Sequence, residues 1–404
     1  MSGTSYDLVL ASVRLPSGEG PTEIAISGGR IVAIGSGLAA SASRVEDAAG
    51  AVVLPALTDA HCHVDKTVWG SGRWLSHSAG RSLADRIANN VRIREEWGIP
   101  NREFTTHLLN QIVANGTTRI RTHTDLDTEL GLSGVEMVAS LAEEFAGRLD
   151  IEQVAFPQQG LVGKPGLLAL IEQATSAGVS VIGGIDPAGR DRDPVKSLDE
   201  MFGLAVRTGC SIDIHLHDHG LLGAWEIDLI CERTIAEDMR GRVTLSHAYA
   251  LGDIDDNEQR RLADLLVEAQ IGIVTAVPFD SAVLPLRMLR DVGVPVGLGN
   301  DSIRNTWSPF GTADMLQRAM IAGTRYEARS DDELSWILSL ATDGGARVMG
   351  VEPAVIAVGA PADLVLVEAL NEYDAVVSVP PRRLVLKAGV PVARDGEALP
   401  AGAA

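Results

Sequence analysis

The middle of the chain, from about residue 55 to residue 355, repeats one pattern, in which a short apolar run is followed by a longer amphipathic stretch. Apolar runs of about five residues are typical of buried strands, and long amphipathic stretches are typical of helices that cover a sheet. The predicted strands are 57–61, 117–123, 151–156, 179–185, 211–215, 242–247, 272–275 and 294–299, and the helices between them include 82–97, 135–145, 197–208 and 257–270.

Eight alternating units over about 250 residues match a (β/α)8 barrel, in which eight parallel strands close into a ring inside a ring of helices. The competing α/β fold is a doubly wound open sheet. Its glycine-rich turn, Gly-x-Gly-x-x-Gly, does not follow the first strand at residues 57–61. We therefore predict the α/β class and a (β/α)8 TIM barrel.

The two ends of the chain differ from the middle, because they consist of short apolar runs separated by turns rich in glycine, proline and serine. The runs are 6–11, 22–26, 30–35, 362–367 and 383–393, with no long helix among them. We predict one small β-sandwich domain assembled from residues 1–54 and 356–404, and a catalytic barrel domain over residues 55–355.

Composition narrows the functional classes. The 404 residues carry a net charge of −20, which disfavours nucleic acid or an anionic membrane surface as a partner. Three cysteines cannot form a disulfide framework. The N-terminus lacks a basic segment followed by an apolar one, and no apolar run is long enough for a membrane span. We expect a cytoplasmic protein.

Candidate chemistry begins with His61 and His63, which close the first predicted barrel strand. Side chains on a strand alternate between its two faces, so residues two apart point the same way. The pair could therefore form half of a metal site. On its own the pattern is a weak signal, because a polar strand end looks the same.

The other histidines strengthen this interpretation. Seven of the nine histidines lie at or just after the carboxyl ends of predicted strands, namely His61, His63, His123, His215, His217, His219 and His247. In a barrel these ends share one face, where the βα loops build the active site. Asp301 follows the last strand. Histidine and carboxylate ligands suit Zn2+ or Fe2+ with a bound water, whose pKa the ion lowers to supply hydroxide.

Four motifs carry a resemblance to a known family. They are Asp-Ala-His-Cys-His-Val-Asp-Lys at 59–66, Arg-Thr-His-Thr-Asp at 121–125, Ser-His-Ala at 246–248 and Trp-Ser-Pro-Phe-Gly-Thr-Ala-Asp-Met at 307–315. Over nearly its whole length the chain resembles the amidohydrolase superfamily, and within it the cytosine deaminase group. The motifs at 215–220 and 301–304 are most similar to members of that group that remove an alkylamine from a triazine ring.

The resemblance implies that His61, His63, His215 and Asp301 bind one divalent metal ion, Zn2+ or Fe2+. Members with two metal ions use a lysine after the fourth strand, and residues 181–186 contain none. His247 would hold or deprotonate the water bound to the metal. Asp301 would be both a ligand and a proton acceptor, because a carboxylate has spare lone pairs.

The proton donor departs from the cytosine deaminase pattern. Cytosine deaminases have a glutamate three residues after the histidine of the fifth strand, where this chain has Asp218. Either Asp218 or His217 is then the predicted donor to a ring nitrogen or a leaving amine. The alternative role of His217 is to orient neighbouring groups. Ser302 replaces a second aspartate of the cytosine deaminases, which disfavours cytosine itself.

The remaining site predictions concern the substrate. The amide of Gln158 suits the O=C–N–H edge of a heterocycle, Lys66 could orient a carbonyl-rich ring or pair with Asp65, and Trp307 could wall the pocket or pack on the barrel rim. The predicted substrate contacts are Gln158, Lys66, Trp307, Ser302 and His123.

Together these features predict a metal-dependent hydrolytic deaminase or aminohydrolase of a small nitrogen heterocycle, of the triazine or pyrimidine type, that releases ammonia or an alkylamine. Deamination of cytosine or isocytosine and hydrolysis of a cyclic amide are the alternatives. A non-catalytic scaffold is disfavoured, because no expected ligand is missing from the sequence. Such barrels are often homo-oligomers, and the sequence leaves that state open.

Overall fold

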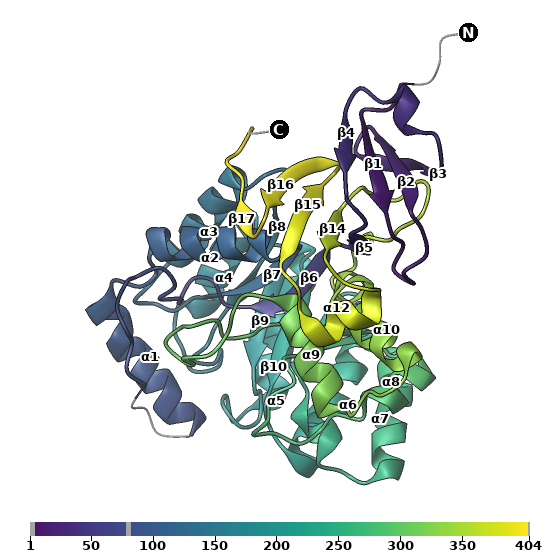
Figure 1. Cartoon of the computed structure of the whole chain (residues 1–404). Coiled ribbons are helices and arrows are strands. Elements are labelled where there is room, and N and C mark those ends of the chain that lie inside the picture. The colour runs from purple at the N-terminus through teal and green to yellow at the C-terminus, as the bar shows by residue number, and fades with distance from the viewer. Residues whose placement is uncertain (1–4, 78–81, 403–404) are drawn as a thin grey trace.

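The computed structural model describes residues 5–77 and 82–402, and its centre is a barrel of eight parallel strands in sequential order (Figure 1). A bridge between Cys62 and Asp301 joins the first strand to the segment after the last and closes the ring. The strands are β6 (Leu57–Cys62), β7 (Thr117–Asp125), β8 (Asp150–Phe156), β9 (Val181–Ile185), β10 (Ser211–Leu216), β11 (Val243–His247), β12 (Gly272–Thr275) and β13 (Val296–Leu298).

Helices connect successive strands and surround the barrel, so the predicted (β/α)8 architecture is confirmed. They are α1 (Leu83–Trp97), α2 (Arg102–Ala114), α3 (Ser133–Glu144), α4 (Leu167–Ser176), α5 (Pro194–Thr208), α6 (Gly220–Ala236), η2 (Tyr249–Gly252), α7 (Asp256–Glu268), α8 (Leu286–Val292), α9 (Met315–Arg325), α10 (Asp331–Leu340) and α11 (Asp343–Val348). The bounds of the predicted strands differ from those of β6 to β13 by a few residues at most.

Both ends of the chain form sheets beside the barrel. A four-stranded sheet contains β1 (Leu8–Val13), β2 (Thr22–Ser27), β3 (Arg30–Gly35) and β4 (Val45–Asp47), which is preceded by η1 (Ala39–Ser41). A five-stranded sheet contains β5 (Val52–Pro55), β14 (Leu364–Val367), β15 (Arg382–Lys387), β16 (Val390–Arg394) and β17 (Glu397–Ala398), with α12 (Glu372–Ser378) between β14 and β15.

The five-stranded sheet lies between the N-terminal sheet and the barrel (Figure 1). Its β5, from before the barrel, pairs antiparallel with β14, from after it. Alternating side chains divide between two cores, with Val53 and Leu364 facing the N-terminal sheet and Leu54 and Val365 facing the barrel. The alternating pattern of the terminal strands therefore encodes both packing faces.

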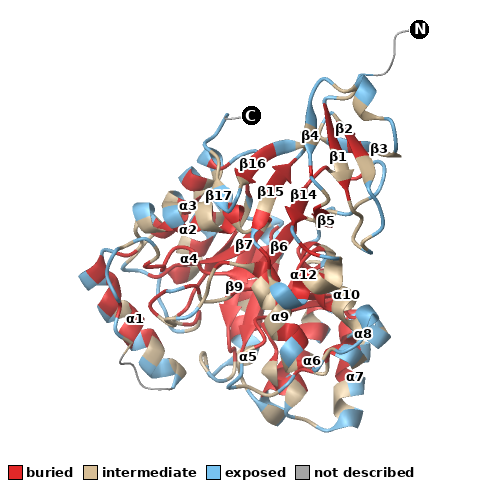
Figure 2. Cartoon of the chain, viewed as in Figure 1, coloured by how far each residue is buried: buried red, intermediate tan, exposed pale blue. Residues whose placement is uncertain are grey.

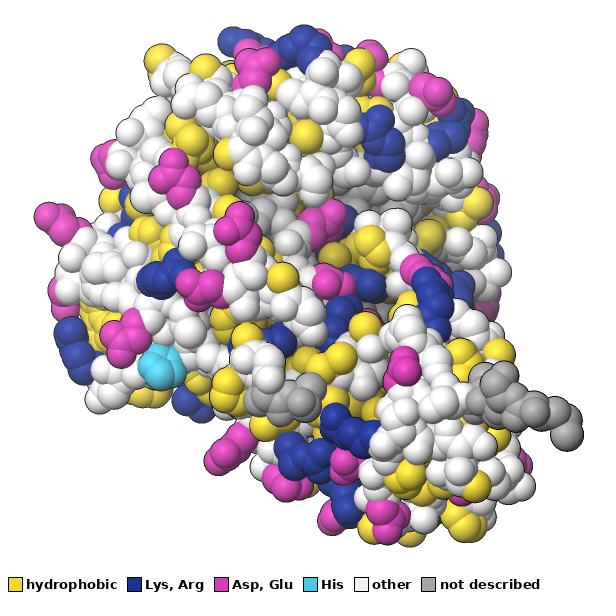
Figure 3. Space-filling view, turned by 90° about the horizontal axis from the view of Figure 1, so that it is seen from above, with side chains coloured by type: hydrophobic (Ala, Val, Ile, Leu, Met, Phe, Trp, Pro, Cys, Tyr) yellow, Lys and Arg dark blue, Asp and Glu magenta, His cyan; other side chains and the backbone are white. Residues whose placement is uncertain are grey.

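The distribution of buried residues agrees with this arrangement of barrel, helices and sheets. The barrel strands are buried almost throughout, whereas exposed residues lie on the outer faces of the helices (Figure 2). On the face near the two termini, acidic and basic side chains are interspersed (Figure 3). Across residues 5–77 and 82–402, the longest apolar helical segments fall short of what a membrane crossing requires.

Candidate active site

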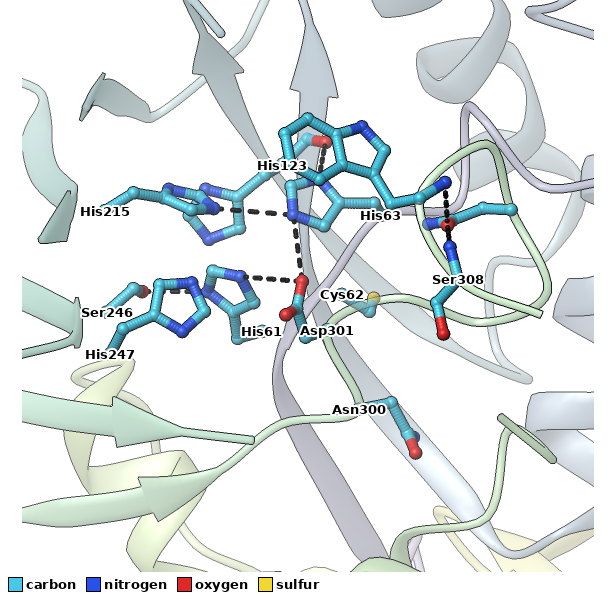
Figure 4. Close-up of polar contacts among 12 residues, drawn as sticks. His61, Cys62, His63, His123, His215, Ser246, His247, Asn300, Asp301 and Ser308 are labelled. Atoms are coloured by element: carbon cyan, nitrogen blue, oxygen red, sulfur yellow. Dashed lines mark hydrogen bonds and ion pairs between the residues drawn. The ribbon is translucent and has the colours of Figure 1, made fainter. Parts of the chain in front are cut away.

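Four side chains that the sequence predicts as metal ligands converge at the carboxyl end of the barrel (Figure 4). The Oδ1 atom of Asp301 lies 3.4 Å from His63 Nε2 and 3.7 Å from His61 Nε2. His215 Nε2 lies 3.4 Å from His63 Nε2. His61 lies on β6 and His63 directly after it, His215 lies on β10, and Asp301 follows β13, so the closure of the barrel brings the four residues together.

Backbone contacts between the two ends of the barrel fix this geometry. The Asp301 amide donates to the His61 carbonyl at 2.8 Å, and the His63 amide donates to the Asp301 carbonyl at 3.2 Å. Gly299 is required here, because a Cβ atom at this position would lie 2.5 Å from the His61 carbonyl oxygen. Asp301 itself has φ +58°, a strained conformation of the kind that clusters at functional sites.

The donor atoms fit a divalent metal ion. Zinc bonds to histidine nitrogen and carboxylate oxygen measure about 2.0–2.2 Å, so neighbouring ligand atoms lie roughly 3–4 Å apart, as the separations above do. His63 Nδ1 lies 3.0 Å from the carbonyl oxygen of His123, so it carries the proton and leaves Nε2 free. Among the described residues, the buried His61 Nε2 has no hydrogen-bond partner. Burial lowers the pKa of His63 to about 4, with a smaller contribution from the charge of Lys66, and this favours the neutral form that can bind a metal ion.

His247 lies against this cluster. It ends β11, and its nitrogen lies within 4.8 Å of those of His61 and His215. Burial, and then His217, lower the pKa of His247 and favour its neutral form, which can accept a proton. The hydroxyl of Tyr249 lies 3.3 Å from His247 Nδ1. Sequence reasoning missed Tyr249, although its position two residues after a predicted strand end placed it on the correct face.

His217 is held by a residue that sequence reasoning also missed. Asp186, which follows β9, accepts from the His217 amide at 2.5 Å and lies 2.9 Å from His217 Nδ1. The His217 ring stacks on that of His247, with centroids 4.6 Å apart. Burial opposes the charged form, but Asp186 raises the pKa of His217 above its usual value. Asp186 thus occupies Nδ1 of His217 and leaves the second ring nitrogen, Nε2, available for other contacts.

Asp218 is engaged elsewhere. Its Oδ2 accepts from the Gly189 amide at 2.6 Å, and its carboxyl group lies close to that of Glu226. Glu226 in turn accepts from the Ala188 amide at 2.7 Å. Burial raises the pKa of Glu226 to about 9. Of the two predicted proton donors, His217 is therefore the one that contacts His247, and Asp218 holds the loop after β9.

Lys66 and Gln158 belong to a second polar group beside the ligands. Lys66 is 1% exposed and donates to Asp125 at 2.7 Å. Hydrogen bonding orients the Gln158 amide so that its oxygen lies 2.9 Å from Lys66 Nζ and 3.2 Å from Trp307 Nε1. The buried Asn90, from α1, lies between Asp125 and the Gln158 amide. The structure thus joins three predicted substrate contacts in one hydrogen-bonded group and adds Asn90, which no sequence motif indicated.

The other two predicted substrate contacts lie apart from this group. His123 is fully buried on β7, with its ring centroid 4.1 Å from that of His61. Its carbonyl is the group that orients His63. Ser302, which is partly buried, directly follows Asp301.

Known proteins match this chain over almost its whole length. A family model described as "Amidohydrolase family" matches residues 44–393. N-isopropylammelide isopropyl amidohydrolase from Pseudomonas sp. (strain ADP) is 31% identical over 96% of this chain and 98% of that protein. The crystal structure of N-isopropylammelide isopropylaminohydrolase from Burkholderia multivorans ATCC 17616 is 40% identical, with a TM-score of 0.92 over 97% of this chain and 99% of that chain.

A more distant structure shares the fold. The 5-methylcytosine deaminase from Klebsiella pneumoniae, liganded with 5-fluorocytosine, has a TM-score of 0.81 at 23% identity and covers 96% of this chain and 97% of that chain. Both solved structures thus share the overall fold of this chain over nearly its whole length.

Proposed function

Since the chain belongs to the amidohydrolase family, we propose that it is a metal-dependent hydrolase that removes an amino group, as ammonia or an alkylamine, from a nitrogen heterocycle of the triazine or pyrimidine type. The observation that carries this proposal is the convergence of His61, His63, His215 and Asp301 at the mouth of the barrel, with His217 and His247 stacked beside them.

His61, His63, His215 and Asp301 would hold one divalent ion, Zn2+ or Fe2+. When bound, such an ion lowers the pKa of a water molecule to near neutrality and so makes it a nucleophile. His247 is suited to accept the proton of that water, because burial favours its neutral form. The carboxylate of Asp301 has further lone pairs and can share this role.

His217 would donate a proton to the ring nitrogen or to the departing amine. Asp186 holds its Nδ1, so that Nε2 carries the available proton. Protonation of the amine makes it a better leaving group. Asp218 accepts a hydrogen bond from the Gly189 amide, which disfavours it as the donor.

Lys66, Gln158 and Trp307 would bind the ring. Their hydrogen-bonded group lies beside His63, and Lys66 Nζ lies 5.6 Å from the centroids of both Phe156 and Trp307. A buried ammonium with aromatic neighbours suits a flat heterocycle that bears carbonyl oxygens or negative charge. Relatives that are named for N-isopropylammelide support a triazine with an alkylamino group over cytosine.

A product assay tests the proposal. Zinc-loaded protein is offered N-isopropylammelide, ammelide, cytosine and isocytosine in parallel, and released isopropylamine and ammonia are quantified. We expect isopropylamine from the first substrate to be the fastest product. Faster release of ammonia from cytosine would identify a cytosine deaminase instead, and turnover of none of the four would reject the proposed substrate class.

A further inference from the structure

A chain of buried polar side chains runs beneath the candidate metal site, through the interior of the barrel. His61 Nδ1 lies 2.8 Å from Ser246 Oγ (Figure 4), and Ser246 Oγ donates to Asp213 Oδ1 at 2.6 Å. Arg121 Nη1 donates to the other oxygen, Asp213 Oδ2, at 3.1 Å. Each of the four residues is at most 2% exposed. Barrel interiors are usually filled by branched apolar side chains, so this buried polar chain calls for a functional explanation.

The chemistry of these groups sets the direction of every hydrogen bond. A carboxylate only accepts, so the single proton of the Ser246 hydroxyl points to Asp213. The Ser246 oxygen must then accept, and the proton it accepts is on His61 Nδ1. His61 is thereby held in the tautomer whose Nε2 has a free lone pair. That Nε2 faces Asp301 at 3.7 Å.

Asp213 cannot easily turn away from Ser246. Arg121 occupies its second oxygen, and Arg121 Nε in turn donates to Glu152 at 2.7 Å. The hydrogen bond between the side chains of Asp213 and Ser246 joins the neighbouring strands β10 and β11, in which His215 is directly opposite Ser246. β10 thus carries both the ligand His215 and the orienting residue Asp213.

We propose that Asp213 and Ser246 are positioning residues that fix the tautomer of His61 and thereby determine how tightly the site binds its metal ion. This inference rests on the metal centre of the proposed function and is independent of the substrate. Groups that accept the second N–H of a metal-binding histidine commonly contribute about 10- to 100-fold to metal affinity.

Two variants disturb this series of buried polar side chains in different ways. Ser246→Ala removes the acceptor of the His61 proton, and we expect zinc affinity to fall about 10- to 100-fold. Asp213→Asn reverses the polarity, because its oxygen stays on Arg121 and its amino group faces Ser246. The Ser246 hydroxyl then donates to His61 Nδ1 and selects the tautomer that cannot bind metal through Nε2. We expect a loss at least as large as that of Ser246→Ala.

Thr244→Val is the matched control. Thr244 is buried on the same strand as Ser246, and its hydroxyl accepts from Arg121 Nη1 at 3.1 Å. Valine has nearly the same shape, so this variant removes a buried hydrogen bond to Arg121 and leaves Asp213, Ser246 and His61 in place. Its zinc affinity should match that of the unchanged protein.

Competition of each apo-protein with a chromophoric chelator for zinc measures the affinities, and 15N NMR of the histidine side chains reports the tautomer of His61. Circular dichroism checks folding, and Ser246→Ala decides the question if Asp213→Asn does not fold. Equal affinity in Ser246→Ala, Thr244→Val and the unchanged protein would overturn the proposal. If the unchanged protein itself did not bind zinc, the metal centre would be rejected as well, whereas tight binding without turnover would reject only the proposed substrate.

Discussion

The imidazole of His217 stacks on that of His247, with centroids 4.6 Å apart and ring planes inclined by 26°. The two rings have opposite protonation preferences. Asp186 raises the pKa of His217 in spite of burial, whereas burial, and then His217 itself, lower the pKa of His247. Hydrolysis of a C–N bond needs one group that accepts a proton and one that donates one, and this pair supplies both at one edge of the metal site.

Replacement of His217 should separate catalysis from metal binding. We expect His217→Asn to lower kcat about 10²- to 10⁴-fold, the usual contribution of a general acid, while the protein retains its metal ion. Asp218→Asn is the matched control, because Asp218 contacts Gly189 and Glu226 and should have a small effect. Steady-state kinetics and metal analysis of both variants test this, and an equal loss in Asp218→Asn would contradict it.

The pH profile should depend on Asp186. A proton donor must be protonated, so activity should fall as the pH rises through the pKa of His217, which Asp186 raises above 6.5. Asp186→Asn removes the negative charge but keeps a hydrogen-bonding group. The alkaline limb of kcat/KM against pH should therefore shift to lower pH in this variant. A limb at the same pH in both proteins would show that His217 is not the donor.

Loss of a ligand should abolish both metal retention and turnover. Asp301 Oδ1 faces His61 and His63. Asp213, another carboxylate near His61, is held by Ser246 and Arg121. We expect Asp301→Ala and His215→Ala to lose metal during dialysis and to show no product release. Full activity of Asp301→Ala would refute the ligand assignment.

Glu226 should make stability depend on pH. Burial raises its pKa from 4.5 to about 9, so the folded state holds a proton that the unfolded state releases. Stability from this group is complete below the unfolded pKa and is lost as the pH rises towards 9. Glu226→Gln mimics the protonated acid, and we expect a smaller decline in melting temperature between pH 6 and about pH 9. An identical decline in both proteins would show that Glu226 is ionised in the folded state.

Sequence periodicity and residue type predicted most of the fold and the gathering of histidines at one end of the barrel. The eight strands, and the positions of His61, His215 and Asp301 at their carboxyl ends, follow from alternation of apolar runs and from the geometry of a barrel. The apolar runs are local patterns, and the barrel rule that all strand ends share one face then applies to every strand, so a single sequence is enough to detect both.

Contacts between loops could not be predicted in the same way. Asp186 holds His217 from the neighbouring strand, with a backbone φ of +38° that nothing in the sequence indicates. Asn90 reaches Gln158 from α1, a helix in the connection between β6 and β7. The position of this helix depends on how the whole mouth of the barrel packs. The resemblance to cytosine deaminases placed Asp218 beside the substrate, but the turn before α6 directs its carboxylate to Gly189.

The most direct test of the account is a reconstitution titration of apo-protein with zinc or ferrous ion, during which released isopropylamine from N-isopropylammelide and bound metal are measured together. The account predicts no turnover without metal, and an increase that reaches its maximum at one equivalent of metal per chain. Turnover by metal-free protein, or a requirement for two equivalents, would contradict a hydrolase with a single metal ion at His61, His63, His215 and Asp301.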